Sequence, residues 1–258
     1  RYAWKQNTMT NHFDLTAEEL FLFQHNGYLR VPQALDPALV TQLRATILQH
    51  ADARIPPIVC EDPDRPGQPK TGDIPGARVL RLSKVIDRDP IFWGAASAPR
   101  LVAALTQLLE PNVELVLNRH NHATLRPPGA AQLEWHRDVA NWSRPLVTAI
   151  FYLEDATIER GCTYVVPGSQ QMLAYHATLS GHGRLDTLGR LGEQAVPIMA
   201  QAGDVLLMHG LVLHSAGANR SGGSRMSMTL GYHAADELGA SEEPQKRLVA
   251  GERILRHN

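Results

Sequence analysis

His136 and Asp138 stand two residues apart at the end of the apolar, strand-like run Leu133–Asp138. Residues i and i+2 of a β-strand point to the same face, so the imidazole and the carboxylate could bind one metal ion. Two ligands do not complete a site. His214, within the later strand-like run Val212–Ser215, is the candidate third ligand. Two histidines and one carboxylate that leave coordination positions open are typical of non-haem Fe(II) oxygenases.

Arg225 lies farther along the chain, in the strand-like run 224–229, where every second residue is expected to point inward. A buried arginine that faces a metal site needs an anion, and its planar guanidinium matches a carboxylate through two parallel hydrogen bonds. The three candidate ligands together supply one negative charge. They therefore leave room for an anionic chelating cosubstrate and for oxygen, whereas a structural zinc site has a fourth protein ligand.

The composition is that of a globular protein that binds small molecules. The chain has 258 residues, 43% of them apolar and 20% charged, which is enough to bury a full core. A formal net charge of -1 gives no field that attracts nucleic acid, and no Lys/Arg run marks a membrane surface. We expect small-molecule partners, no nucleic acid and no membrane, and the oligomeric state stays open.

Only two cysteines occur, Cys60 and Cys162, and they form no CxxC pair. Their number and spacing speak against a disulfide framework and against a thiolate zinc site. No apolar run approaches the roughly 20 residues that cross a bilayer, and the first residues lack the apolar core of a signal peptide. We expect a cytoplasmic protein.

The first hundred residues carry helix signals. Thr16 and Glu19 form a capping-box pattern at the start of a helix that Asn26-Gly27 ends, and a short strand is expected over 28–31. Asp36-Pro37 begins a second helix, because aspartate is a good N-cap and proline fits the first turn. Further along, the patterns predict a strand over 79–86 and a helix over 99–109.

From residue 113 onward the chain has the texture of short strands separated by turns. We expect strands over 113–126, 132–138, 146–153, 162–166, 195–199, 204–208, 211–214 and 224–233. This density of strands predicts a mainly β fold with flanking helices, a jelly roll or another double-sheet β fold. We expect one domain over 1–258, with helical support over 9–110, the jelly-roll core over 111–235 and a tail over 236–258 that forms a peripheral helix.

Two segments are candidate loops over the site. Residues 56–78 are rich in proline and charge, so we interpret them as a lid, with simple surface disorder as the alternative. Residues 171–192 are Gly-rich and carry several basic side chains, so they could form a second loop at the mouth. Substrate selectivity is expected to reside in these two segments, and the substrate itself is not predicted.

The chain resembles the Fe(II)/2-oxoglutarate-dependent dioxygenases, specifically the phytanoyl-CoA dioxygenase-like family. Five segments in the family's order carry this resemblance: Leu20–Leu29 with its Asn-Gly-Tyr turn, His136-Arg137-Asp138, Gly161–Ser169, Gly203–Gly210, and His214–Asn219 followed by Arg225. The HxD motif alone is weak, because it occurs by chance in many proteins.

The resemblance implies a double-stranded β-helix (jelly-roll) core with Fe(II) on His136, Asp138 and His214. Arg225 would bind the distal carboxylate of 2-oxoglutarate, whose keto-acid end chelates the iron. The family oxidises an unactivated C–H bond with O2 and converts 2-oxoglutarate to carbon dioxide and succinate, usually with hydroxylation. Related halogenases have Gly or Ala at the carboxylate position, so Asp138 favours hydroxylation or another oxidation over halogenation.

Two further contacts to the oxoacid are suggested at lower specificity. The position of Ala216 leaves the hydroxyl partner of the oxoacid unassigned, and either Ser215 or Thr163 could supply it. Asn121, on the expected strand before the HxD motif, could contact the end of the oxoacid near the iron. An edge strand with a solvated polar face is the competing interpretation of that stretch.

Several alternatives remain open at this point. His209 is a rival third ligand, and we favour His214 because its spacing to Arg225 matches the family that the chain resembles. A non-catalytic jelly roll that binds a metal or a small ligand is possible, since a fold does not fix a function. A zinc hydrolase could use the same three ligands, but no carboxylate general base stands at a recognisable spacing.

Overall fold

The computed structural model describes residues 13–65, 68–139, 146–172, 189–235, 237–238, 245–253 and 255–256. Its first helix is α1 (Ala17–Asn26), and the predicted capping box is present. The Glu19 amide donates to Thr16 Oγ1 at 3.1 Å, and the Thr16 amide donates to Glu19 Oε2 at 2.8 Å. The helix ends at Gly27, which has a left-handed φ of 79°.

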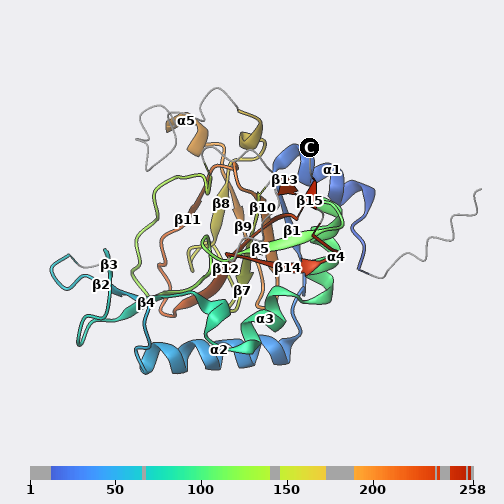
Figure 1. Ribbon diagram of the computed structural model, residues 1–258. Coiled ribbons are helices and arrows are strands. Elements are labelled where there is room, and N and C mark those ends of the chain that lie inside the picture. The colour runs from blue at the N-terminus through green and yellow to red at the C-terminus, as the bar shows by residue number, and fades with distance from the viewer. Residues whose placement is uncertain are drawn as a thin grey trace, which may run out of the picture.

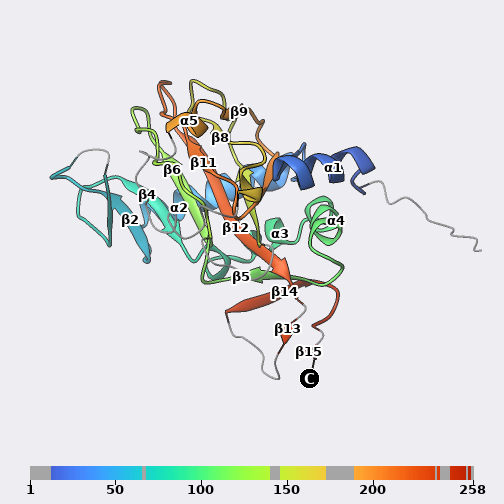
Figure 2. The same cartoon turned by 90° about the horizontal axis from the view of Figure 1, so that it is seen from above.

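Two antiparallel sheets oppose each other and form the predicted double-stranded β-helix (Figures 1 and 2). The larger has ten strands, in the order β1 (Tyr28–Val31), β10 (Val205–His209), β7 (Leu146–Tyr152), β12 (Arg225–Ala234), β6 (His122–Arg126), β4 (Val79–Ser83), β2 (Ile58–Glu61) and β3 (Pro69–Thr71), while β5 (Val113–Val116) pairs with both β12 and β14 (Lys246–Ala250). The smaller has the order β11 (His214–Ala216), β8 (Thr163–Val165) and β9 (Val196–Ile198). A parallel pair, β13 (Glu237–Leu238) and β15 (Leu255–Arg256), lies apart from both.

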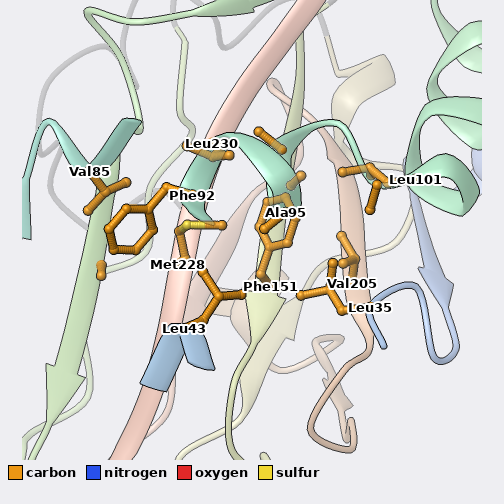
Figure 3. Close-up of a cluster of buried hydrophobic side chains, with 14 of the residues drawn as sticks. Leu35, Leu43, Val85, Phe92, Ala95, Leu101, Phe151, Val205, Met228 and Leu230 are labelled. Atoms are coloured by element: carbon orange, nitrogen blue, oxygen red, sulfur yellow. The ribbon is translucent and has the colours of Figure 1, made fainter. Parts of the chain in front are cut away.

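The helices α2 (Pro37–Asp52), α3 (Pro90–Ala96) and α4 (Pro99–Leu108) cover the outer face of the larger sheet (Figure 1). Figure 3 shows how Leu43 of α2 and Phe92 of α3 meet Phe151 of β7 and Met228 of β12. All four side chains are fully buried. Burying a large apolar side chain stabilises the folded protein by about 1.5–3 kcal/mol. The helices therefore hold the larger sheet in place from its outer face.

The opposite face of the larger sheet packs on the smaller sheet. Tyr152 of β7 and Leu206 and Met208 of β10 meet Val165 of β8 and Ile198 of β9 in a second buried cluster. The short helices are η1 (Val85–Asp87), η2 (Ser169–Gln171) and α5 (Gly189–Gly192). Among the residues that the structure describes, no helix has the length and apolar content of a membrane span.

Several predicted elements were wrong in extent. Residues 56–78 are not a long loop, because they contain β2 and β3, and β2 is buried as it pairs with β4. The expected strand 113–126 is two strands, since the chain turns between β5 and β6 with a left-handed φ of 50° at His120. The strand expected over 211–214 begins only at His214. Helix α3 was not predicted.

The expected strand 132–138 and the expected C-terminal helix are corrected too. Residues 132–138 make only one isolated β-bridge, between His136 and His214, and no regular ladder. In the tail, β14 adds to the edge of β5 as a strand. Of the second expected loop, 171–192, the part 173–188 lies outside the described residues.

Candidate metal centre

Backbone pairing brings His136 beside His214. Each amide donates to the carbonyl of the other at 3.0 Å, and the Asp138 amide donates to Gly210 O at 3.0 Å. The segment therefore runs along β11 although it is not a regular strand. As a result, ligand atoms of His136, Asp138 and His214 all lie within 4.8 Å of one another. The structure brings together the three residues that the sequence predicted as ligands.

Hydrogen bonds fix the side of each imidazole that faces the centre. Nδ1 of His136 lies 2.8 Å from Glu134 O, and Nδ1 of His214 lies 3.0 Å from Val212 O. A carbonyl oxygen only accepts, so Nδ1 carries the proton in both rings. Nε2 therefore keeps its lone pair for a metal, which is the usual arrangement of ligating histidines.

The carboxylate of Asp138 is oriented from both sides. Its Oδ2 accepts from Thr148 Oγ1 at 2.6 Å, and its Oδ1 lies 3.7 Å from His214 Nε2 and 3.4 Å from His120 Nε2. Burial raises the pKa of Asp138. The opposite effect of His214, His120, the Thr148 hydroxyl and His136 is larger in sum, so the pKa is lowered to about 2. The group is therefore an ionised ligand at neutral pH.

A cavity of about 810 Å³ opens beside these ligands, which line it. Its wall is built from β6 and β12, which run side by side (Figure 2). Alternate residues of the two strands face it as three cross-strand pairs: Arg126 with Arg225, Thr124 with Ser227, and His122 with Thr229. The period of two along each strand is what places these polar side chains on one face.

Arg225 is only 3% exposed and lines this cavity. Its Nη1 donates to Gly161 O at 2.6 Å, while its Nε has no partner. Within the described ranges no acidic side chain pairs with it, so its charge is uncompensated. Thr163 lines the cavity too, and its Oγ1 accepts from Tyr152 OH at 2.9 Å.

The structure does not bring the other suggested residues to the cavity. Ser215 Oγ donates to Leu133 O at 2.6 Å, and Asn121 accepts from the Ile86 amide at 3.0 Å and donates to Leu117 O at 3.1 Å. Asn121 borders a smaller cavity of about 590 Å³ instead. His209, the rival ligand, accepts from the Leu211 amide and lies outside the three-residue cluster.

Sequence reasoning missed Arg126 and Thr148. The signal for Arg126 was present, because His122, Thr124 and Arg126 alternate along one strand. No sequence pattern announced Thr148, which meets Asp138 only through the fold. Of the expected lid 56–78, Val59, Glu61, Pro69 and Arg78 line the cavity from β2, β3 and the segment before β4.

The donor set fits Fe(II) better than a closed structural metal site. It offers two imidazole nitrogens and one carboxylate on one side of the centre, and among the described residues no fourth ligand joins the cluster. The adjoining cavity leaves space for small molecules on the open side. Five arginines and two acidic residues line it, so it favours anions: Arg78, Arg81, Arg126, Arg137, Arg225, Glu61 and Asp138.

Comparison with known proteins gives the same assignment. The chain is 22% identical over 237 residues to dioxygenase lolE1 of Epichloe uncinata, covering 86% of this chain and 84% of that protein. It is 32% identical over 116 residues to dioxygenase andF of Emericella variicolor, but this match covers only 41% of the chain and 37% of the relative.

Among solved structures, the fold matches the epimerase SnoN in complex with Fe3+, alpha ketoglutarate and nogalamycin RO. The TM-score is 0.67 at 20% identity, covering 92% of this chain and 96% of SnoN. The family model described as phytanoyl-CoA dioxygenase (PhyH) matches residues 23–227, which include all three metal-site residues and Arg225. The chain therefore belongs to the phytanoyl-CoA dioxygenase family of Fe/2-oxoglutarate dioxygenases.

Proposed function

We propose that this protein hydroxylates an unactivated C–H bond of a small molecule, with Fe(II) and 2-oxoglutarate as cofactors. One observation carries the proposal: an open three-residue metal site and a buried, uncompensated arginine line the same cavity. A non-catalytic metal-binding protein has no need of that arginine. A zinc hydrolase needs a carboxylate base near the metal. Among the described residues that line the cavity, the acidic ones are Glu61 and Asp138, and Asp138 would itself be a metal ligand.

His136, Asp138 and His214 would hold Fe(II), and Arg225 would bind the distal carboxylate of 2-oxoglutarate. When bound, these cofactors supply an oxidant for C–H bonds at the expense of O2 and of 2-oxoglutarate, which becomes succinate and carbon dioxide. The residues of the chain orient these groups and shield them from water.

Thr163 is the hydroxyl that supports Arg225 in this proposal. Its oxygen already accepts from Tyr152, so its own proton is free to be donated into the cavity. Ser215 is a poorer candidate because its proton is used by Leu133 O. The pair of Arg225 and Thr163 therefore offers a carboxylate one charged and one neutral donor.

Asp138 supports hydroxylation over halogenation, because a carboxylate at this position occupies the coordination site that a halide would need. Its hydrogen bond from Thr148 holds it in place as a ligand. The substrate is proposed to be small, since the cavity of about 810 Å³ must also accept the oxoacid. The five arginines that line the cavity favour a substrate with anionic or other polar groups.

The proposal extends to one domain over the whole chain and to a cytoplasmic location. Cys60 and Cys162 are both buried and free, as expected in a reducing compartment. No role is assigned to either thiol.

Oxygen-isotope labelling tests the reaction type. Candidate small molecules are incubated with the iron-loaded enzyme, 2-oxoglutarate and 18O2, and succinate and product masses are followed together. Hydroxylation predicts a product heavier by one 18O atom and succinate formed in step with it. An unchanged mass would indicate epimerisation, the activity named for SnoN, and a loss of two hydrogens would indicate cyclisation or desaturation. Either result contradicts the hydroxylase proposal.

A further inference from the structure

A second cavity, of about 590 Å³, adjoins the cavity at the metal centre. Three residues line both cavities: Arg81, His120 and His122. Arg81 lies on β4, which runs beside β6 (Figure 2), and it is the direct cross-strand partner of Thr124. Directly opposed side chains point to the same face of a sheet, and Thr124 lines the first cavity. Arg81 therefore stands where the two cavities meet.

The lining of the second cavity is basic. It includes Arg81, Lys84 and Arg119, while Asp87 is the acid of its described wall. Among the residues that the structure describes, neither Arg81 nor Lys84 forms an ion pair with a carboxylate. A wall with more cations than acids attracts anions, and charged donors form the stronger hydrogen bonds to an oxyanion.

Asn121 joins the two turns that build this cavity. Its Oδ1 accepts from the Ile86 amide at 3.0 Å, and its backbone carbonyl accepts from the Val85 amide at 3.4 Å. Its Nδ2 donates to Leu117 O at 3.1 Å. The turn after β4 and the turn before β6 are therefore held at a fixed separation, which lowers the cost of ordering a bound ligand.

Both turns contain a residue with an unusual backbone. Lys84 has a φ of 55° and His120 a φ of 50°, and both residues line the second cavity. Residues other than glycine adopt this left-handed conformation rarely, and residues held in such conformations cluster at active sites and ligand-binding sites. The backbone thus supports a binding role for this cavity.

The second cavity has a defined position relative to the metal centre. Arg119 Nη1 donates to Asp138 O at 3.1 Å, and His120 Nε2 lies 3.4 Å from Asp138 Oδ1. Residues of the cavity wall therefore contact a metal ligand directly. Arg225 lines the first cavity and not the second, so an oxoacid on Arg225 leaves the second cavity open.

We propose that the second cavity binds an anionic oxygen group of the substrate, a carboxylate or a phosphate, through Arg81 and Lys84. The C–H bond to be oxidised then lies at the metal centre in the first cavity. This inference rests on the proposed function and deepens it, because it assigns the substrate to small acids whose charged group is remote from the reacting carbon. A guanidinium and an ammonium group suit either oxyanion.

Titration with three short-chain compounds tests this subsite. Hexanoate, hexyl phosphate and hexanamide share an alkyl chain and differ in charge. The protein is loaded with Zn(II) and saturating 2-oxoglutarate, so that Arg225 is occupied, and backbone amide NMR spectra are recorded. We expect at least one anion to shift the signals of 83–87 and 117–122 and to bind about tenfold more tightly than hexanamide. The tighter anion identifies the group as a carboxylate or a phosphate.

Arg81→Gln should remove the preference for the anion over hexanamide. Arg78→Gln is the matched control, because Arg78 lines the first cavity and not the second. It should keep the preference within about twofold, which separates direct contact from the general field of the cavities. Equal loss in the two variants would overturn the inference. Retention of the preference in both Arg81→Gln and Lys84→Met would do so too, and the same spectra show whether each variant is folded.

The same titrations distinguish failure of this inference from failure of the proposed function. If the metal-loaded wild-type protein binds no 2-oxoglutarate, the proposed function and the substrate role of the second cavity fail together. If 2-oxoglutarate binds but neither anion is preferred over hexanamide, or the shifts are confined to the first cavity, only this inference is wrong.

Discussion

His214 Nε2 lies 3.7 Å from Asp138 Oδ1, and this closeness follows from backbone pairing rather than from the side chains. Two reciprocal hydrogen bonds join His136 to His214, and Asp138 follows two residues later on the same face. The carbonyls of Glu134 and Val212 then turn both Nε2 atoms inward. The backbone pairing and these two carbonyl contacts thus determine the geometry of the metal centre.

We predict that His136→Ala and Asp138→Ala each abolish Fe(II) binding, because two remaining ligands cannot hold the ion. His209→Gln should bind one Fe(II) per chain, since His209 accepts from the Leu211 amide and lies outside the ligand cluster. Anaerobic titration calorimetry measures the stoichiometry, and circular dichroism checks that each variant is folded. Loss of iron in His209→Gln, with retention in Asp138→Ala, would mean that the ligand set is misassigned.

Thr163→Val and Ser215→Ala form a matched pair, since each removes one of the two hydroxyls that the sequence suggested as partners of the oxoacid. We predict that Thr163→Val weakens 2-oxoglutarate binding about fivefold, equivalent to roughly 1 kcal/mol for one lost hydrogen bond. Ser215→Ala should leave the Kd unchanged, because the Ser215 hydroxyl donates to Leu133 O and Ser215 does not line the cavity. Calorimetric titration with 2-oxoglutarate measures the Kd of both variants. The reverse order of effects would assign the hydroxyl to Ser215.

Arg253→Met is predicted to destabilise the protein by about 3 kcal/mol. Glu114 of β5 is fully buried and contacts the Arg253 guanidinium, so removing the arginine leaves a buried charge without its main partner. Removing one partner of a buried ion pair typically costs about 3–5 kcal/mol of stability. The lower value applies here because His233 Nε2 also lies near Glu114, 3.3 Å from its Oε2. Urea unfolding measures the change. The double variant Glu114→Gln/Arg253→Met should recover most of it, and a loss below about 1 kcal/mol in the single variant would contradict this prediction.

His122 predicts a dependence of stability on pH. Burial, followed by the charges of Arg81 and His120, lowers its pKa to about 3, so the folded protein keeps the ring neutral. The unfolded chain takes up a proton below about pH 6.5, so its stability relative to the folded state rises as the pH falls. The free energy of unfolding therefore falls by up to about 2 kcal/mol between pH 6.5 and 5, and by less to the extent that solvent reaches the ring.

His122→Gln should lose less stability than the wild-type protein when urea unfolding is compared at pH 7 and pH 5. Both proteins share every other titrating group, so the difference between their two losses isolates His122. Equal losses in the two proteins would show that the ring is protonated in the folded state.

The residues that act through local pattern were predictable from the sequence. Thr16 and Glu19 predicted a helix start, and the HxD spacing predicted two ligands on one face, because both signals depend only on neighbours in the chain. The strands β2 and β14 were not predictable in this way. β2 is a short apolar run inside a proline-rich and charged stretch, and β14 has a mixed sequence; both form strands because they pair with β4 and β5.

The site shows the same division. Asn121 lies on the polar stretch that sequence reasoning placed near the oxoacid, but the left-handed turn at His120 aims its amide at Ile86 and Leu117. Thr148 meets Asp138 across two segments whose proximity only the folded sheet creates. Contacts between distant segments depend on the register between strands, which turn geometry and burial across the whole sheet set, so the local pattern of one segment does not reveal them.

One cavity of this protein is expected to bind both Fe(II) and 2-oxoglutarate. Anaerobic addition of Fe(II) and then 2-oxoglutarate to the purified protein, followed by visible spectroscopy, tests it most directly. We predict a weak metal-to-ligand charge-transfer band that needs both additions and is lost in Asp138→Ala. Absence of the band in an iron-replete wild-type sample would contradict the account.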